Sequence, residues 1–197
     1  MQRFIIKATA GVILLMLFFP GLLMAESVRS LIDSGNTAYD QGDYAKSLDH
    51  YKKAAEIDPD SAVALFNKGN AFYKLGNYPE AFNAYEKAAG KAIKEDNLQL
   101  EAQSRYNMGN SAFRRAEKLV QEAPETAYEE FNRSSQNFQS ALKLDPKISD
   151  AGHNLEVARI KARKVEELMR RQQQQKQLQQ KLVQLLCWDC SAKMQLN

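Results

Sequence analysis

The chain has 197 residues, a formal net charge of +3, two histidines and two cysteines. A charge so close to neutrality does not supply the concentrated basic stripe that nucleic acid requires, so no nucleic-acid partner is expected. β-Branched runs and strand-type alternation are scarce, which predicts an all-α chain. The length suffices for one elongated domain with a continuous core.

The first 25 residues have the layout of a secretory signal. Arg3 and Lys7 precede an apolar run over residues 8–23, and Ala25 ends the segment just before polar sequence begins. This layout predicts export with cleavage after Ala25. An uncleaved inner-membrane anchor through residues 8–25 stays open, because the run is only a little short of the roughly 20 residues that span a bilayer. In both interpretations the positive end stays inside and the remainder is periplasmic.

Three related segments follow, with a period of about 34 residues. They read GNTAYDQGDYAKSLDHYKKAAEIDP from Gly35, GNAFYKLGNYPEAFNAYEKAA from Gly69, and YNMGNSAFRRA from Tyr106, the last closing after an insertion as FQSALKLDP at Pro146. Each copy is too small to bury its own apolar face, so the copies must stack. The period therefore predicts a helical solenoid.

Glycines mark two kinds of position in the repeat. Gly35, Gly69 and Gly109 sit inside a helical pattern, where glycine costs about 1 kcal/mol relative to alanine. We therefore expect a neighbouring element to cross there with no room for a side chain. Gly42 and Gly76 fall at the predicted turn of each hairpin, where a positive φ is useful.

The second helix of each hairpin carries an apolar stripe with offsets of three and four residues, which predicts burial toward the stack. The stripe comprises Leu48, Tyr51 and Ala54 in the first copy, and Ala81, Tyr85 and Ala88 in the second. Proline follows aspartate at Pro59 and Pro146 and ends the second helix, since the residue before proline is pushed out of the α region.

At these glycine, aromatic and proline positions the chain resembles the tetratricopeptide repeat (TPR) family, over roughly residues 28–164. The resemblance implies an all-α solenoid of about three TPR helix hairpins with a long C-terminal capping helix. The repeats are expected at residues 28–61, 62–101 and 102–148. The second has an extended second helix, and the third carries an insertion near residues 117–128 whose hairpin turns at Pro124.

Residues 149–182 are expected to cap the open end of the stack and then to project as a glutamine-rich helix. The projecting part reads RRQQQQKQLQQK from Arg170, with sparse apolar residues. A partly frayed solvated helix, a short coiled-coil seam to a partner, and disorder all remain open for it.

The tail at residues 183–197 contains a CxxC formed by Cys187 and Cys190. A local disulfide, a pair of free thiols and a functional redox pair are the three interpretations. Two thiols do not fill a tetrahedral zinc site. We therefore predict neither a metal nor a cofactor.

The sequence predicts no catalytic site. His50 and His153 have no cysteine or carboxylate neighbours at ligand spacing, and we expect His50 to face water and His153 to pack or hydrogen-bond. Phosphate-binding loops, serine–histidine–aspartate order and zinc-protease motifs are missing from the sequence. We expect a protein that is not an enzyme.

In the TPR family the first helix of each repeat lines a concave groove, so the resemblance implies protein-binding residues at matching positions. These are Asn36, Tyr39 and Asp40 in the first copy, Phe66, Asn70, Tyr73 and Lys74 in the second, and Tyr106, Asn110, Phe113 and Arg114 in the third. An amide can donate to and accept from an extended peptide backbone, and Lys74 and Arg114 can pair with a carboxylate.

A packing interpretation of the same face stays open. Asn67 and Asn107 are placed to brace neighbouring helices, and some of the tyrosines are packing residues of the repeat. The carboxylate-clamp subfamily has a basic residue where Ile32 stands here, so we do not expect its ligand.

A narrower resemblance concerns the whole arrangement. The runs FNKGNAFYKLGNYPEAFNAYEKA, YNMGNSAFRRA and ALKLDP, followed by DAGHNLEVAR and a glutamine-rich helix, are similar to the exported TPR component of bacterial aerotolerance (Bat) operons. That resemblance implies an envelope scaffold beside membrane proteins with von Willebrand A domains and a MoxR-type ATPase. The alternative function is a structural oligomer assembled through the C-terminal helix.

Overall fold

The computed structural model describes residues 26–148 and 150–194, with side chains up to residue 186. The predicted signal segment at residues 1–25 lies outside this range. The described residues form seven helices and no strand, which confirms the all-α prediction. The helices are α2 Val28–Asp40, α3 Tyr44–Ile57, α4 Ala62–Lys74, α5 Tyr78–Lys94, α6 Leu98–Leu119, α7 Pro124–Leu144 and α8 Ala151–Met194.

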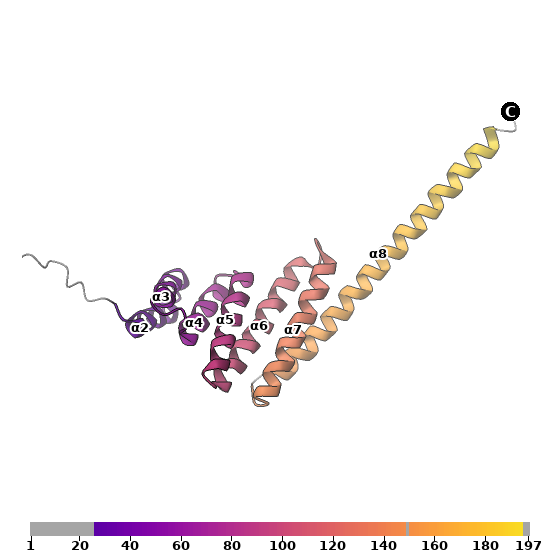
Figure 1. Ribbon diagram of the computed structural model, residues 1–197. Coiled ribbons are helices and arrows are strands. Elements are labelled where there is room, and N and C mark those ends of the chain that lie inside the picture. The colour runs from indigo at the N-terminus through magenta and orange to yellow at the C-terminus, as the bar shows by residue number, and fades with distance from the viewer. Residues whose placement is uncertain (1–25, 149, 195–197) are drawn as a thin grey trace, which may run out of the picture.

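The helices pair into three hairpins that stack in chain order (Figure 1). The hairpins are α2 with α3, α4 with α5 and α6 with α7, and they stack through α3 on α4 and α5 on α6. α2 also contacts α4, and α4 contacts α6. We call the side of the stack formed by α2, α4 and α6 the inner face. The TPR-type hairpin solenoid is thus confirmed.

Helix starts follow local capping chemistry. Ser27, Asp43, Ser61 and Asn97 each accept a hydrogen bond from a backbone N–H in the first turn of the following helix. Such a bond satisfies one of the donors that a helix start leaves unpaired. Pro124 is the first residue of α7, so the third hairpin turns where it was expected to.

The insertions lengthen helices rather than loops. α6 and α7 have 22 and 21 residues, against 13 and 14 in the first hairpin. α5, the second helix of the second hairpin, has 17 residues against 14 in α3. The third hairpin therefore reaches further along α8 than a standard repeat would.

The repeat glycines show the close contacts and the positive φ angles that the sequence predicts. A Cβ on Gly69 would lie 2.7 Å from the ring of Tyr85, and one on Gly109 would lie 2.7 Å from the ring of Phe138. Gly35 is covered in the same way by Tyr51. The crossing element is thus an aromatic ring of the second helix. The turn glycines have φ values of +79° at residue 42 and +75° at residue 76.

The core consists of alanines with a few large rings between them. All six residues of the predicted second-helix stripe are buried, and Tyr51, Tyr85, Phe131 and Phe138 are among the largest buried side chains. Alanine lets helices approach closely, and the rings of Tyr51, Tyr85 and Phe138 fill the space that a facing glycine leaves.

The final helix α8 has 44 residues and divides into a packed and a projecting part. Ala151, Ala158, Ala162 and Val165 are buried, as expected of a capping helix. From residue 170 to residue 186 every described side chain is exposed, and Figure 1 shows this yellow end leaving the stack. Within residues 26–148 and 150–194, no helix has the length and apolar composition needed to cross a bilayer.

Candidate functional site

The eleven residues predicted to line a groove all lie on the helices of the inner face, and each is half-buried or exposed. They are Asn36, Tyr39 and Asp40 on α2, Phe66, Asn70, Tyr73 and Lys74 on α4, and Tyr106, Asn110, Phe113 and Arg114 on α6. Their helices and exposure fit a contact surface. The contacts of all but Asp40, the last residue of α2, separate them into three groups.

The first group consists of asparagines that are already hydrogen-bonded. In repeat one, Asn36 Oδ1 accepts from the hydroxyl of Tyr51 at 2.7 Å and from Asn67 Nδ2 at 3.2 Å. These two bonds use both lone pairs of the amide oxygen. Asn67 comes from α4, so the contact braces the second repeat against the first.

Repeat two copies this arrangement. Asn70 Oδ1 accepts from Tyr85 at 2.8 Å and from Asn107 Nδ2 of α6 at 3.3 Å. We call the two sets of bonds the asparagine ladder. The bracing interpretation of Asn67 and Asn107 is confirmed. The expectation that Asn36 and Asn70 both donate to and accept from a peptide is wrong for their oxygens, because the ladder occupies them.

The ladder ends at repeat three. Phe138 takes the place of the two tyrosines and has no hydroxyl to donate. Asn154 of α8 donates from Nδ2 to the hydroxyl of Tyr106 at 3.1 Å. Among the described residues, the side chain of Asn110 therefore has no hydrogen-bond partner, and it is only half-buried. Its amide can both donate and accept.

A cavity of about 260 Å³ opens at this asparagine. It is lined by Tyr73, Asn110, Phe113, Arg114, Phe138, His153, Asn154 and Val157. Four of the eleven predicted residues meet here. The α8 residues were not predicted as lining, although DAGHNLEVAR begins like the first helix of a fourth repeat, and that likeness was the available signal.

The second group consists of aromatic residues that pack as well as face outward. Ring centroids lie 5.1 to 5.6 Å apart in the pairs Tyr39–Tyr44, Phe66–Tyr85, Tyr73–Tyr78, Tyr106–Phe138 and Phe113–Phe131. Burial, with the neighbouring tyrosines Tyr44 and Tyr51, raises the pKa of Tyr39. Each predicted aromatic thus packs on one partner ring, as the packing interpretation expects.

The third group is the pair of cations. The side chain of Arg114 is 53% exposed at the cavity and lies 3.0 Å from Glu117. Hydrogen bonding to Tyr73 and to Glu117 raises the pKa of Arg114, so its guanidinium keeps its charge. Glu117 also lies 3.6 Å from Lys161 of α8. Lys74 sits apart, with its ammonium 5.8 Å from the ring centre of Tyr44.

Of the histidines and cysteines, only His153 is among the residues that line the cavity. The imidazole of His50 is half-buried with Nδ1 enclosed, so the expectation that it faces water is wrong. His153 is exposed and lines the cavity. Cys187 and Cys190 belong to α8, but their side chains lie outside the described ones, so their disulfide stays a prediction. In the part of the chain that the structure describes, no cluster of histidine, cysteine and carboxylate residues can hold a metal.

The described residues thus form a stack of helical hairpins whose inner face has a cavity at the last repeat. Residues 35–76 match the family model described as TPR repeat, and residues 63–91 match the one described as tetratricopeptide repeat. These matches place tetratricopeptide repeats within residues 35–91, in a chain whose described residues have the TPR-type hairpin fold. No curated protein matches its sequence.

Solved TPR domains share the fold at low sequence identity. The first TPR domain of human RPAP3 is 18% identical with a TM-score of 0.58, covering 72% of this chain and 97% of that one. The N-terminal domain of stress-induced protein-1 from C. elegans is 21% identical with a TM-score of 0.55, covering 67% and 94%. The first TPR of Spaghetti (RPAP3), bound to the HSP90 peptide SRMEEVD, is 19% identical with a TM-score of 0.54, covering 74% and 94%.

Proposed function

We propose that this protein is a protein-binding adaptor that holds an extended segment of a partner against its inner face. The observation that carries the proposal is the open amide of Asn110 beside the cation of Arg114. An amide matches the alternating donors and acceptors of a peptide backbone, and a guanidinium matches a carboxylate.

The cavity supports a side chain rather than a separate small molecule as the occupant. Its volume of about 260 Å³ is below the 300–1,000 Å³ that is typical of drug-sized ligand sites. Tyr73, Phe113 and Val157 give it apolar walls, and Arg114 stands at its rim. We expect an apolar side chain of the partner inside and an acidic group at Arg114.

Solved relatives of the fold give the proposal its precedent. The Spaghetti (RPAP3) domain is bound to the peptide SRMEEVD, and the second TPR domain of human RPAP3 is in complex with the HSP70 peptide SGPTIEEVD. Both peptides carry acidic residues. We infer a peptide segment with acidic character for this chain, held at Arg114 and without the carboxylate clamp that Ile32 interrupts.

A matched pair of variants tests the site. Asn110→Ala/Arg114→Ala should reduce partner recovery about tenfold or more, because it removes the open amide and the cation at the rim of the cavity. Asn83→Ala/Lys87→Ala changes an asparagine and a cation at the same spacing, at two exposed positions of α5, and should leave recovery unchanged. The measurement is quantitative mass spectrometry of cross-linked complexes purified from the native host. Equal losses in the two variants, with helical content intact, would count against the cavity.

We propose further that the adaptor works in a bacterial cell envelope, in an aerotolerance-type complex. The support is the sequence of residues 1–25 and the resemblance to the Bat component. In this proposal the chain is exported, then either cleaved after Ala25 or tethered by residues 8–25 to the inner membrane. Its partners are membrane-associated von Willebrand A-domain proteins together with a MoxR-type ATPase.

Two measurements bear on this context. The intact mass of the protein from periplasmic and membrane fractions should show either a start at Glu26 or a full-length membrane-bound form. The same cross-linked complexes should contain a von Willebrand A-domain protein. A full-length cytoplasmic protein would refute export while leaving the cavity test unaffected.

A further inference from the structure

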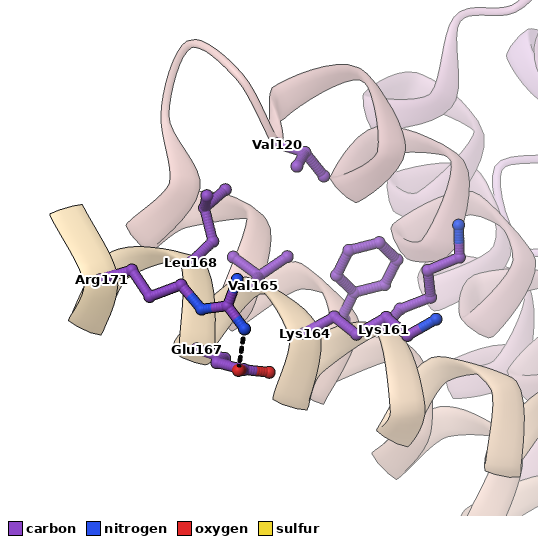
Figure 2. Close-up of a pocket in the computed structure, with 8 residues that line it drawn as sticks. Val120, Lys161, Lys164, Val165, Glu167, Leu168 and Arg171 are labelled. Atoms are coloured by element: carbon purple, nitrogen blue, oxygen red, sulfur yellow. Dashed lines mark hydrogen bonds and ion pairs between the residues drawn. The ribbon is translucent and has the colours of Figure 1, made fainter.

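A second hollow lies away from the inner-face cavity, between the tip of the α6–α7 hairpin and α8. Its volume is about 380 Å³. Figure 2 shows Val120 of the hairpin lying across the hollow from Val165 and Leu168 of α8. Phe131 of α7 completes its apolar wall. The lengthened third hairpin creates this hollow, because its tip reaches past the end of the standard repeat.

Cations surround the hollow. Lys161, Lys164 and Arg171 line it together with one acid, Glu167. Arg171 is paired with Glu167 and Lys161 with Glu117. Lys164 is exposed and, among the described residues, has no ion-pair partner. An apolar side chain entering here would bring its neighbours close to an unneutralised positive charge.

The lining residues of α8 belong to a longer row with a regular spacing. Steps of three and four residues alternate along Lys161, Lys164, Leu168, Arg171, Gln175, Leu178, Leu182 and Leu185. We call this row the α8 seam. Alternating steps average 3.5 residues, the spacing that keeps one helix face turned toward a second helix. The seam starts in the hollow and continues onto the projecting part of α8.

The outer end of the seam is apolar and uncovered. Leu178, Leu182 and Leu185 are 71%, 57% and 62% exposed. Val183 and Leu186, 55% and 59% exposed, flank the row and widen its apolar face. The alternating spacing of the leucines favours a helical partner. A bilayer surface also has no side chain to insert between the hairpin tip and α8.

The charge around the seam selects the chemistry of that partner. Residues 168–186 contain Arg170, Arg171, Lys176 and Lys181 but no aspartate or glutamate. A second copy of this chain would set these cations against one another, which disfavours self-pairing. A helix with acidic residues beside its apolar row is complementary in both respects.

We propose that the α8 seam is a second docking surface, which binds an acidic amphipathic helix of a partner protein. The partner helix lies along α8, inserts an apolar side chain into the hollow beside Val120, and packs its leucine-type row on Leu178, Leu182 and Leu185. This surface is separate from the inner-face cavity and takes a folded helix rather than an extended segment.

A designed probe tests the proposal on the full-length chain. The probe is a fluorescein-labelled helical peptide of about three heptads, with leucine at the seam positions and glutamate beside them. Its twin carries lysine in place of glutamate. Fluorescence anisotropy should show binding of the acidic peptide at least about tenfold tighter than that of the twin, weakening as salt rises.

Two seam variants and a matched control locate the binding. Leu178→Gln/Leu182→Gln and Lys164→Glu/Arg171→Glu should each weaken acidic-peptide binding by about tenfold or more. Arg159→Glu/Arg163→Glu makes the same charge change on exposed positions of α8 outside the seam and should alter it by less than about threefold. Asn110→Ala, which leaves the Arg114–Glu117 pair in place, should leave it unchanged, which separates this surface from the inner-face cavity. The leucines are exposed, so their replacement preserves the fold.

Three outcomes would overturn the proposal. One is an equal loss in the seam and control variants. Another is no peptide binding alongside leucine-dependent binding to phosphatidylglycerol vesicles, which would assign the seam to a membrane surface. The third is a leucine-dependent dimer of the chain, seen by light scattering without peptide binding, which would assign it to a second copy.

Discussion

In the first two repeats a tyrosine of the second helix fills the space over the glycine and also donates to the asparagine that follows it, at Asn36 and Asn70. In the third repeat Phe138 fills the same space and donates nothing. In the first two repeats one tyrosine both packs on the glycine and donates a hydrogen bond, and in the third repeat these two roles are separated. Ring packing is kept in all three repeats, whereas the hydrogen bond is lost in one, and the open cavity lies at that repeat.

All three repeats share the tight contact between a glycine and an aromatic ring. Gly69→Ala would place a Cβ 2.7 Å from Tyr85, so overpacking should cost about 1–3 kcal/mol of unfolding free energy. Gly90→Ala in α5 meets nothing within 4 Å and should instead stabilise by up to about 1 kcal/mol through helix propensity. Urea unfolding followed by circular dichroism measures both, and two shifts of the same sign would contradict the packing explanation.

The repeats differ in the hydrogen bond from the ring to the asparagine, and replacing the asparagines by alanine tests this difference. Asn70→Ala should cost about 1–3 kcal/mol, because it leaves the hydroxyl of Tyr85 and the amide of Asn107 without their acceptor. Asn110→Ala should change the unfolding free energy by less than about 0.5 kcal/mol, since no bond is lost. Denaturant midpoints of the two variants give the comparison. Similar costs would mean that Asn110 has a structural role.

Exchanging the hydroxyl should convert one kind of repeat into the other. Phe138→Tyr would bring a hydroxyl to Asn110 as Tyr85 does to Asn70, adding about 0.5–1.5 kcal/mol of stability. The same change should weaken partner binding, because it occupies the open amide. Thermal unfolding and partner recovery from the host are the two readouts. A gain in both stability and binding would disprove the link between them.

The buried tyrosine hydroxyls of the asparagine ladder should make the unfolding free energy depend on pH in alkaline solution. Burial raises the pKa of Tyr85, and burial likewise raises that of Tyr51. An unfolded tyrosine ionises near pH 10. The stability contribution of these two residues is therefore complete below about pH 10 and declines as the pH rises above it. Tyr85→Phe should flatten that decline relative to Tyr128→Phe, outside the ladder, in unfolding curves recorded across this range.

The repeat frame could be predicted from the sequence because its signals are local and occur more than once. Gly35, Gly69 and Gly109 each required a close contact, and Gly42 and Gly76 each required a positive φ, so every copy supported the others. Pro124 fixed the turn of the long hairpin for the same kind of local reason.

Which asparagines of the inner face are free to bind a ligand could not be predicted from the sequence in the same way. Whether Asn70 is available depends on a tyrosine one helix later and an asparagine one repeat later, and residue types do not reveal which lone pairs are taken. The substitution of Phe138 for tyrosine was visible in the sequence, but its consequence for Asn110 requires the geometry. The hollow beside Val120 arises from an insertion, for which the repeat offers no template.

One carboxylate connects the two surfaces. Glu117 lies 3.0 Å from Arg114 and 3.6 Å from Lys161, so it is shared between the rim of the cavity and the start of the α8 seam. A ligand acid that draws Arg114 away leaves Glu117 to neutralise Lys161, which reduces the attraction for an acidic helix. Thermodynamic linkage makes this antagonism equal in both directions. Ligand binding at either surface then lowers the affinity of the other. Titrating one ligand in the presence of the second measures the coupling free energy between the two surfaces.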